Sequence, residues 1–338
     1  MSTTDDFKKA INLLKKSKSW LVTSHTRPDG DAVGSMKAVC EIAKQLGKSA
    51  QPILLSPLAQ WYEFIFDAPV PVLGNDVKFD QLEAGSFGKF DLVVIVDTNS
   101  YVQLTEFDKW LRTSKIPVLV IDHHLTGDGI GTVEVIDSTA AATGEIIFEL
   151  FKSAGWEITP AIAEALYIAI STDTGWFRFD NTDSRVMRNA SSLIELGARP
   201  SVVYHKIYQN YSPARLKLLG KMLENLELYH DGKIALQYIM RSDFDSTGAK
   251  GTDTEEFVNE CQRVSSVEAV ALFVELKDGG FRCSLRSNGK VDVRKIAAEL
   301  GGGGHKVAAG VNLKGSLAQV KKLILDRFER ELEKDETV

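Results

Sequence analysis

Apolar residues in the first half of the chain alternate between helical and strand spacing. Residues 7–14 and 36–46 place apolar side chains on one face of a helix, and the second helix is expected to end at Gly47. Four short apolar runs predict strands: Trp20–Ser24, Pro52–Leu55, Leu92–Val96 and Val118–Ile121. The last two are continuous and rich in Val and Ile, which is typical of strands buried on both faces. This alternation predicts a parallel sheet in an α/β domain, with ligands beyond the carboxyl ends of the strands.

The pattern changes after Asp183, where helical spacing dominates to about Glu227 and Pro200 and Pro213 mark helix starts. Three strand-like runs follow, Ile234–Met240, Val267–Leu276 and Phe281–Leu285, with a hairpin turn expected at Asp278-Gly279-Gly280 and helices at Val293–Leu300 and Ser316–Glu333. We therefore expect an N-terminal parallel-sheet domain over residues 1–190, a helical connector over 191–226 and a smaller α+β domain over 227–338.

Composition and charge narrow the class of protein. The chain has 338 residues, 44% of them apolar and 25% charged, which is typical of a globular protein with room for two cores. Its net charge of −6 argues against a protein that coats long nucleic acid, whereas a local metal charge would still allow a small anionic substrate. No apolar run predicts a membrane span, and the N-terminus has no signal-peptide core. Three widely spaced cysteines form neither a disulfide framework nor a zinc pattern, so we expect a cytoplasmic location.

Acidic and histidine side chains follow the predicted strands at the points where those strands end. The first strand is followed by His25, Asp29 and Asp31, the third by Asp97, and the fourth by Asp122, His123 and His124, while Asp173 follows an apolar stretch at 165–170. Because parallel strands end at one edge of a sheet, we expect these side chains to converge. Oxygen and nitrogen donors without thiolate suit Mn²⁺ or Mg²⁺, or else Fe²⁺ or Co²⁺, better than a structural zinc. The sequence therefore predicts a divalent-metal centre.

The segment Asp29-Gly30-Asp31 is expected to be extended, so that both carboxylates point to one side, roughly 6.6 Å apart. Each could then address its own ion of a pair about 3.5–4 Å apart, with Gly30 allowing a tight turn between them. Each motif also has an ordinary structural interpretation, such as a turn at Asp29–Asp31 or a helix cap at Asp97. Convergence of all the motifs on one sheet edge favours the metal centre over these separate interpretations.

A glycine-rich stretch, Gly301 to Gly304, precedes His305 and Lys306 in the expected C-terminal domain. Four consecutive glycines exceed what a helix cap needs, and they would let backbone N–H groups approach an anion closely. A flexible hinge is the alternative interpretation. Arg286, at the end of a predicted strand, is a weaker candidate, because an isolated arginine is usually a surface residue.

These motifs resemble those of the DHH phosphoesterase superfamily. The matching segments are Ser24–Asp31, Val96–Asn99, Asp122–His124 and Ser171–Gly175, while Gly301–Gly310 resembles the glycine-rich motif of the DHH-associated C-terminal domain. A chain with these two domains and no other is similar to the nanoRNase/pAp phosphatase group.

The resemblance implies a two-metal centre and a separate substrate-binding site. One metal would be held by His25, Asp29 and Asp97, and the other by Asp31, Asp97, His123 and Asp173, with Asp97 shared. His124 would not be a ligand but would lie beside the reacting phosphate. In the C-terminal domain, the terminal phosphate or nucleotide would be bound by Arg286, Gly303, Gly304 and His305.

The resemblance also implies an activity, that of a metal-dependent phosphoesterase hydrolysing short oligoribonucleotides to mononucleotides and 3′-phosphoadenosine 5′-phosphate (pAp) to AMP. Two divalent ions are the expected cofactors, Mn²⁺ first, with Mg²⁺ or Co²⁺ as alternatives. The expected partners are short single-stranded RNA and small nucleotides, with no long duplex and no membrane, and a monomer and a homodimer are both left open. Two other functions stay open: a phosphodiesterase for linear dinucleotides such as pGpG or a short-strand DNA exonuclease, and a non-catalytic nucleotide sensor.

Overall fold

The computed structural model describes residues 4–125, 127–209, 211–277 and 279–335, with the backbone alone at residues 305, 334 and 335. Contacts within the chain divide it into two compact units, Met1–Asn210 and Tyr211–Val338. The residues of the expected connector belong to both units. Helix α8 (Pro200–Tyr208) is part of the first unit and helix α9 (Pro213–Glu224) is part of the second.

The first unit contains a five-stranded sheet in the order β2-β1-β3-β4-β5. Its strands are β1 (Ser19–Thr23), β2 (Ser49–Pro52), β3 (Leu92–Val96), β4 (Val118–Asp122) and β5 (Val133–Ile136), and every neighbouring pair is parallel. The predicted parallel sheet is confirmed. The strand expected at Pro52–Leu55 is wrong in its bounds, because β2 is a polar, half-buried edge strand whose composition gives little signal.

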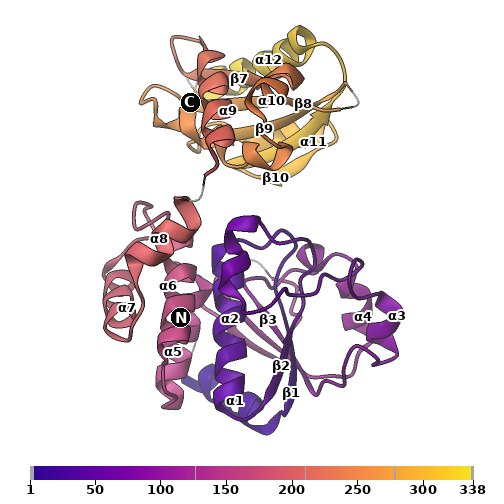
Figure 1. The fold of residues 1–338 in the computed structure, drawn as a ribbon, viewed down its shortest axis with the longest axis vertical. Coiled ribbons are helices and arrows are strands. Elements are labelled where there is room, and N and C mark those ends of the chain that lie inside the picture. The colour runs from indigo at the N-terminus through magenta and orange to yellow at the C-terminus, as the bar shows by residue number, and fades with distance from the viewer. Residues whose placement is uncertain (1–3, 126, 210, 278, 336–338) are drawn as a thin grey trace. The chain divides into compact units, whose positions relative to one another are not determined.

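Helices cover both faces of this sheet (Figure 1). They are α1 (Thr4–Lys16), α2 (Gly30–Gln45), α3 (Phe79–Glu83), α4 (Phe107–Thr113), α5 (Thr143–Ala154), α6 (Pro160–Asp173) and α7 (Ser184–Glu195), with short 3₁₀ turns η1 (Gln60–Ile65) and η2 (Tyr101–Leu104). Side chains of β3 alternate between two cores: Val94 packs with α2, α5 and α6, whereas Val93 and Ile95 pack with α3 and α4. Burial on both faces explains why this strand reads as a continuous apolar run.

Helices α2 and α6 pack closely against each other. A side chain at Gly34 of α2 would overlap with the carbonyl oxygen of Ala165 and lie 3.0 Å from the amide nitrogen of Ala169 in α6. This contact matters for the site, because α2 begins next to Asp29 and α6 ends at Asp173.

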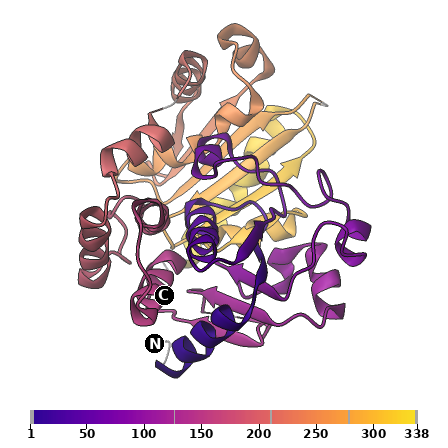
Figure 2. The ribbon, with the colours of Figure 1, turned by 60° about the horizontal axis from the view of Figure 1, so that its bottom comes forward.

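The second unit contains a six-stranded mixed sheet in the order β10-β11-β9-β8-β7-β6, drawn in orange to yellow in Figure 2. Its strands are β6 (Glu227–Tyr229), β7 (Ile234–Ile239), β8 (Ala269–Glu275), β9 (Phe281–Ser287), β10 (Gly303–His305) and β11 (Ala308–Leu313). The three predicted strands are confirmed, and β8 pairs with β9 as expected. The expected turn between them includes residue 278, which lies outside the described residues.

Both faces of the second sheet carry helices. One core packs against α11 (Val293–Glu299) and α12 (Leu317–Asp335), and the other packs against α9, α10 (Arg241–Thr247) and the 3₁₀ turn η4 (Phe257–Arg263), which follows η3 (Gly251–Thr254). The glycine-rich stretch forms β10 rather than a flexible hinge, because Gly303 and Gly304 pair in register with Gly310 and Ala309.

Replacing Gly34 by Leu is expected to force α2 and α6 apart and to lower the free energy of unfolding by about 2–3 kcal/mol. Urea unfolding would measure the change. Gly220→Ala is the matched control, because a β-carbon added to Gly220 in α9 would have no neighbouring atom within 4 Å. Equal stability of Gly34→Leu and the unaltered protein would contradict this close packing.

Candidate metal centre

Asp97 lies immediately after β3 with a positive φ of 60°, and its carboxylate is buried between two histidines. Its Oδ2 is 3.3 Å from Nε2 of His25, and its Oδ1 is 3.5 Å from Nε2 of His123. The two oxygens of one carboxylate therefore face two different donor groups. This is the arrangement required of a ligand that bridges two cations.

Both histidines present the same ring nitrogen to Asp97. Nδ1 of His25 is 2.9 Å from the carbonyl oxygen of Thr26, and Nδ1 of His123 is 3.3 Å from that of Ala140. A proton on each Nδ1 satisfies these carbonyls and leaves the lone pair of Nε2 directed into the site. Metal-binding histidines are commonly oriented in this way.

Asp29 and Asp31 belong to the start of α2, so the extended segment expected from sequence is wrong. Asp29 is the N-cap, and its Oδ1 accepts hydrogen bonds from the amides of Asp31 and Ala32 at 3.0 and 3.1 Å. The expected tight turn at Gly30 is also wrong. Gly30 is helical, and a side chain there would overlap with Thr172 in α6, so glycine allows the two helices to approach.

Asp31 is held by the beginning of another helix. Its Oδ2 accepts a hydrogen bond from the amide of Thr143 at 2.6 Å, and its Oδ1 accepts one from the amide of Gly144 at 2.9 Å. These are unpaired N–H groups of the first turn of α5, which stabilise an anion. The side chain of Thr143 also donates to Oδ1 of Asp97 at 3.2 Å. Sequence analysis missed Thr143 and Gly144, although an apolar helix beginning at this point was a detectable signal.

Asp173, the last residue of α6, completes the group with Oδ2 3.7 Å from Nε2 of His123. Burial, together with the nearby Asp29, raises the pKa of Asp173 to about 7. The pKa values of Asp31 and Asp97 are raised well above the usual range, first by burial and then by neighbouring carboxylates. Carboxylates gathered in this way repel one another unless a cation compensates them, so the donor set fits divalent metal ions.

Three overlapping sets of donor atoms could each surround an ion. They are His25, Asp29 and Asp97; Asp31, His123 and Asp173; and Asp97, His123 and His124, each with its donor atoms within 4.8 Å of one another. The structure thus brings together all six side chains expected as ligands. Which of them bind which ion stays a prediction.

His124 differs from the other two histidines in its hydrogen bonding. Its Nδ1 is 2.7 Å from Oδ1 of Asp122, a hydrogen bond that raises the pKa of His124. The side chain is half exposed, whereas Asp122 is fully buried and also accepts from the amide of His123 at 2.8 Å. Asp122 therefore orients His124 at the open side of the cluster.

The expected substrate-binding residues of the second unit lie on neighbouring strands. Arg286 in β9 is directly opposite Ala308 in β11, which is opposite His305 in β10. Gly303 and Gly304 occupy the same edge strand. The side chain of His305 lies outside what the structure describes, so its part in the site stays a prediction.

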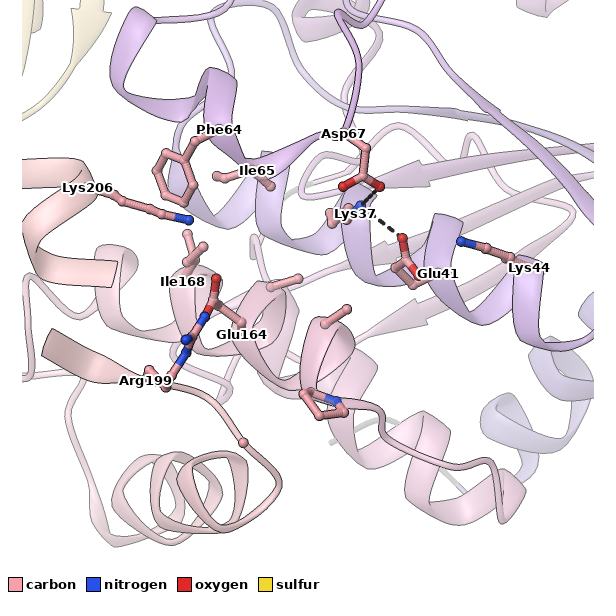
Figure 3. A pocket seen from close by; sticks show the side chains of 14 residues that line it. Lys37, Glu41, Lys44, Phe64, Ile65, Asp67, Glu164, Ile168, Arg199 and Lys206 are labelled. Atoms are coloured by element: carbon pink, nitrogen blue, oxygen red, sulfur yellow. Dashed lines mark hydrogen bonds and ion pairs between the residues drawn. The ribbon is translucent and has the colours of Figure 1, made fainter. Parts of the chain in front are cut away.

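A pocket of about 490 Å³ in the first unit contains none of the six candidate metal ligands (Figure 3). It is bordered by α2, α6 and η1. Five of its charged side chains form ion pairs: Lys37 Nζ lies 2.9 Å from oxygens of both Glu41 and Asp67, and Arg199 Nη2 lies 3.5 Å from Glu164. Two more lysines, Lys44 and Lys206, also line the pocket. None of the candidate metal ligands lines this pocket, so we place the chemistry at the acidic cluster instead.

Comparison with known proteins defines the class to which this fold and site belong. Residues 19–170 match the DHH family, N-terminal domain, and residues 231–334 match the DHHA1 domain. The chain belongs to the DHH family of phosphoesterases. It is 30% identical over 317 residues to the bifunctional oligoribonuclease and PAP phosphatase NrnA of Thermus thermophilus, with 92% of this chain and 89% of that protein covered.

Two further proteins extend the comparison. The NrnA protein of Bacillus subtilis, with the same name, is 27% identical over 292 residues, which cover 86% of this chain and 87% of the relative. The crystal structure of an exopolyphosphatase-related protein from Bacteroides fragilis matches with a TM-score of 0.89 at 25% identity, covering 99% of this chain and 97% of that one. Among the helices that the structure describes, none combines the length and apolar character needed to span a bilayer.

Protein treated with a chelator is expected to lose stability as the pH rises from about 4 to about 7. The raised pKa values mean that the folded state favours the protonated carboxyls. Their contribution to stability is therefore complete below pH 3.8, the ordinary pKa of an aspartate, and is lost as the pH rises through their pKa in the folded protein, about 7 for Asp173. Urea unfolding across this range would measure the loss, which Asp173→Asn should reduce. A flat profile in the chelated protein would contradict the buried-carboxylate repulsion.

Asp97→Asn is expected to abolish stabilisation by Mn²⁺, because one carboxylate serves both donor groups. Asn is chosen because it also tolerates the positive φ of this position, so the backbone should not change. In the unaltered protein, Mn²⁺ at a hundred times its dissociation constant should add about 2.7 kcal/mol to the free energy of unfolding. Thermal unfolding with and without Mn²⁺ measures this, with the exposed Asp180→Asn as control. Retention of the full Mn²⁺ effect in Asp97→Asn would exclude a shared ligand.

Proposed function

We propose that this protein is a two-metal phosphoesterase that hydrolyses short oligoribonucleotides to mononucleotides and pAp to AMP. The observation that carries the proposal is the buried Asp97, whose two oxygens face two separate sets of donors. The names of the relatives from Thermus thermophilus and Bacillus subtilis, which cover most of this chain, support the choice of substrates.

One ion would be held by His25, Asp29 and Asp97, and the other by Asp31, Asp97, His123 and Asp173. When bound, a pair of divalent cations supplies Lewis acidity and lowers the pKa of water. Mn²⁺ is the ion that we propose first, with Mg²⁺ or Co²⁺ as alternatives, because the donors are oxygen and imidazole nitrogen.

His124 would act on the phosphate rather than on a metal. Asp122 would accept a hydrogen bond from Nδ1 and raises the pKa of His124, so a second proton on the ring would be carried by Nε2. That N–H can donate to a phosphoryl oxygen and stabilise the negative charge that develops there. Asp122 has the same role as the carboxylate that orients a catalytic histidine in hydrolases.

The second unit would bind the far end of the substrate. Arg286 offers a planar guanidinium suited to a terminal phosphate. Gly303 and Gly304 lie on the edge strand β10 of the same sheet, where their backbone would approach the phosphate closely. His305 would add a further contact. We propose short single-stranded RNA and small nucleotides as partners. The domain bounds of 1–190, 191–226 and 227–338 remain predictions.

A cytoplasmic location is proposed on the state of the cysteines. Cys40, Cys261 and Cys283 are all free, and the last two are buried. Cys40 is half-buried, and desolvation raises its pKa to about 12, which disfavours its thiolate form at neutral pH. A protein that keeps three free thiols is suited to a reducing compartment.

A substrate panel with Mn²⁺ tests the function. Release of AMP from pAp and of mononucleotides from 5′-phosphorylated dimers to pentamers is expected, with little activity on long duplexes. Arg286→Ala should raise KM at least tenfold for 5′-phosphorylated substrates, since a guanidinium–phosphate contact is lost. Arg263→Ala is the control, because Arg263 is exposed and pairs only with Glu260 among the described residues. Activity on pGpG or DNA dimers alone, or no activity at all, would overturn the proposal.

A further inference from the structure

The guanidinium of Arg286 is held in a fixed orientation by a side chain from another element. Its Nε donates to Oδ1 of Asn259 at 3.0 Å, and its Nη1 donates to the carbonyl oxygen of Leu285 at 3.0 Å. Asn259 lies in η4 and is 27 residues away in sequence. The hydrogen bond therefore depends on packing between η4 and the sheet.

The turn that carries Asn259 is firmly anchored. Phe257, Val258 and Cys261 of η4 are buried in the core that covers β7 and β8, whereas Asn259 is exposed on the opposite side of the turn. The turn starts after Glu256, which has a positive φ of 65°, a strained conformation for a residue with a side chain. Such strain persists where surrounding packing fixes the backbone, as the three buried side chains do here.

The remaining part of the guanidinium is not engaged by the described residues. Nη2 of Arg286 has no hydrogen-bond partner among the residues that the structure describes. The neighbours of Arg286 in register are the buried Val270 on β8 and the small Ala308 on β11, and the next residue on the same face of β11, Gly310, is exposed. The two N–H groups engaged by protein thus fix the plane of the guanidinium, and Nη2 is left for a ligand.

The chemistry of the partner identifies the class of ligand. A carboxylate partner would neutralise the charge of Arg286 and could take both donors of one edge of the guanidinium. Burial lowers the pKa of Arg286, and the nearby carboxylate of Glu256 offsets this only in part and forms no ion pair with Arg286 within the described part of the chain. The amide oxygen of Asn259 fixes the direction of Nε–H and adds no negative charge. This is suited to an arginine whose counter-ion is a bound anion.

We infer that Asn259 is a positioning residue, which orients Arg286 to bind the terminal 5′-phosphate of the substrate. The inference rests on the proposed function for the identity of that phosphate. It adds a residue that no motif of the sequence indicated, and it explains why an amide rather than a carboxylate stands at this position.

Two substitutions of Asn259 separate positioning from a structural role. Asn259→Leu removes the acceptor and should raise KM at least tenfold for a 5′-phosphorylated RNA dimer, with kcat changed less than twofold. Asn259→Asp keeps an acceptor and strengthens the contact with Arg286, so thermal stability is retained. It should nevertheless raise KM, because the added carboxylate competes with the phosphate. For a dimer with a 5′-hydroxyl, both variants should match the unaltered protein.

Binding of AMP and of adenosine to the full chain, measured by calorimetry, gives a readout that needs no turnover. AMP should bind at least tenfold more weakly to both variants, and adenosine should bind equally to all. Asn288→Leu, at another exposed asparagine of the same unit, is the matched control. Unchanged AMP affinity in Asn259→Leu, or normal KM and affinity in Asn259→Asp, would overturn the inference. Failure of the unaltered protein to cleave any substrate would instead overturn the proposed function, and the AMP measurement would still test Asn259.

Discussion

Repulsion among buried carboxylates is the constraint on which the first unit depends. Asp31 and Asp97 are both removed from water, and Asp29 and Asp173 add negative charge beside them. Protein alone compensates this charge only in part, through the first amides of α5 and the hydroxyl of Thr143. Protons or bound cations supply the rest of the compensation, and the neighbouring imidazoles of His25 and His123 are placed to share in binding cations.

The architecture explains how so many donors reach one place. Strands β1, β3 and β4 are parallel neighbours, so their carboxyl ends lie side by side. Two helices then complete the site, α2 with its first turn and α6 with its last residue. Glycines at positions 30 and 34 let these helices pack without intervening side chains, and thereby set the distance between Asp31 and Asp173.

Charge is handled differently in the two units. In the first, buried acids with raised pKa values prepare a site for cations. In the second, Arg286 is oriented by an amide and a backbone carbonyl, so its positive charge stays available for an anion. Under the proposed function, cations would act at the reacting phosphate and Arg286 would bind the terminal phosphate.

Much of this could be predicted from the sequence because strand ends are local features. The Val- and Ile-rich runs at β3 and β4 marked buried parallel strands, and the polar residues directly after them identified Asp97 and His123 as candidates. The helical start at Asp29 was not predicted, although an aspartate before a helix is a common N-cap, because the segment Asp29–Asp31 was expected to be extended. The polar edge strand β2 was misplaced because its composition resembles a loop.

The sequence by itself determined which donors the chain has and the strand ends after which they come, since both follow from residue type and short-range periodicity. Only the tertiary structure decided the directions of those donors. Each oxygen of Asp97 lies near a different histidine, and the amides of Thr143 and Gly144 donate to Asp31. Arg286 donates a hydrogen bond to Asn259. All of these contacts join residues that are distant in sequence. Such contacts depend on how helices and sheets pack, and no local pattern specifies that packing.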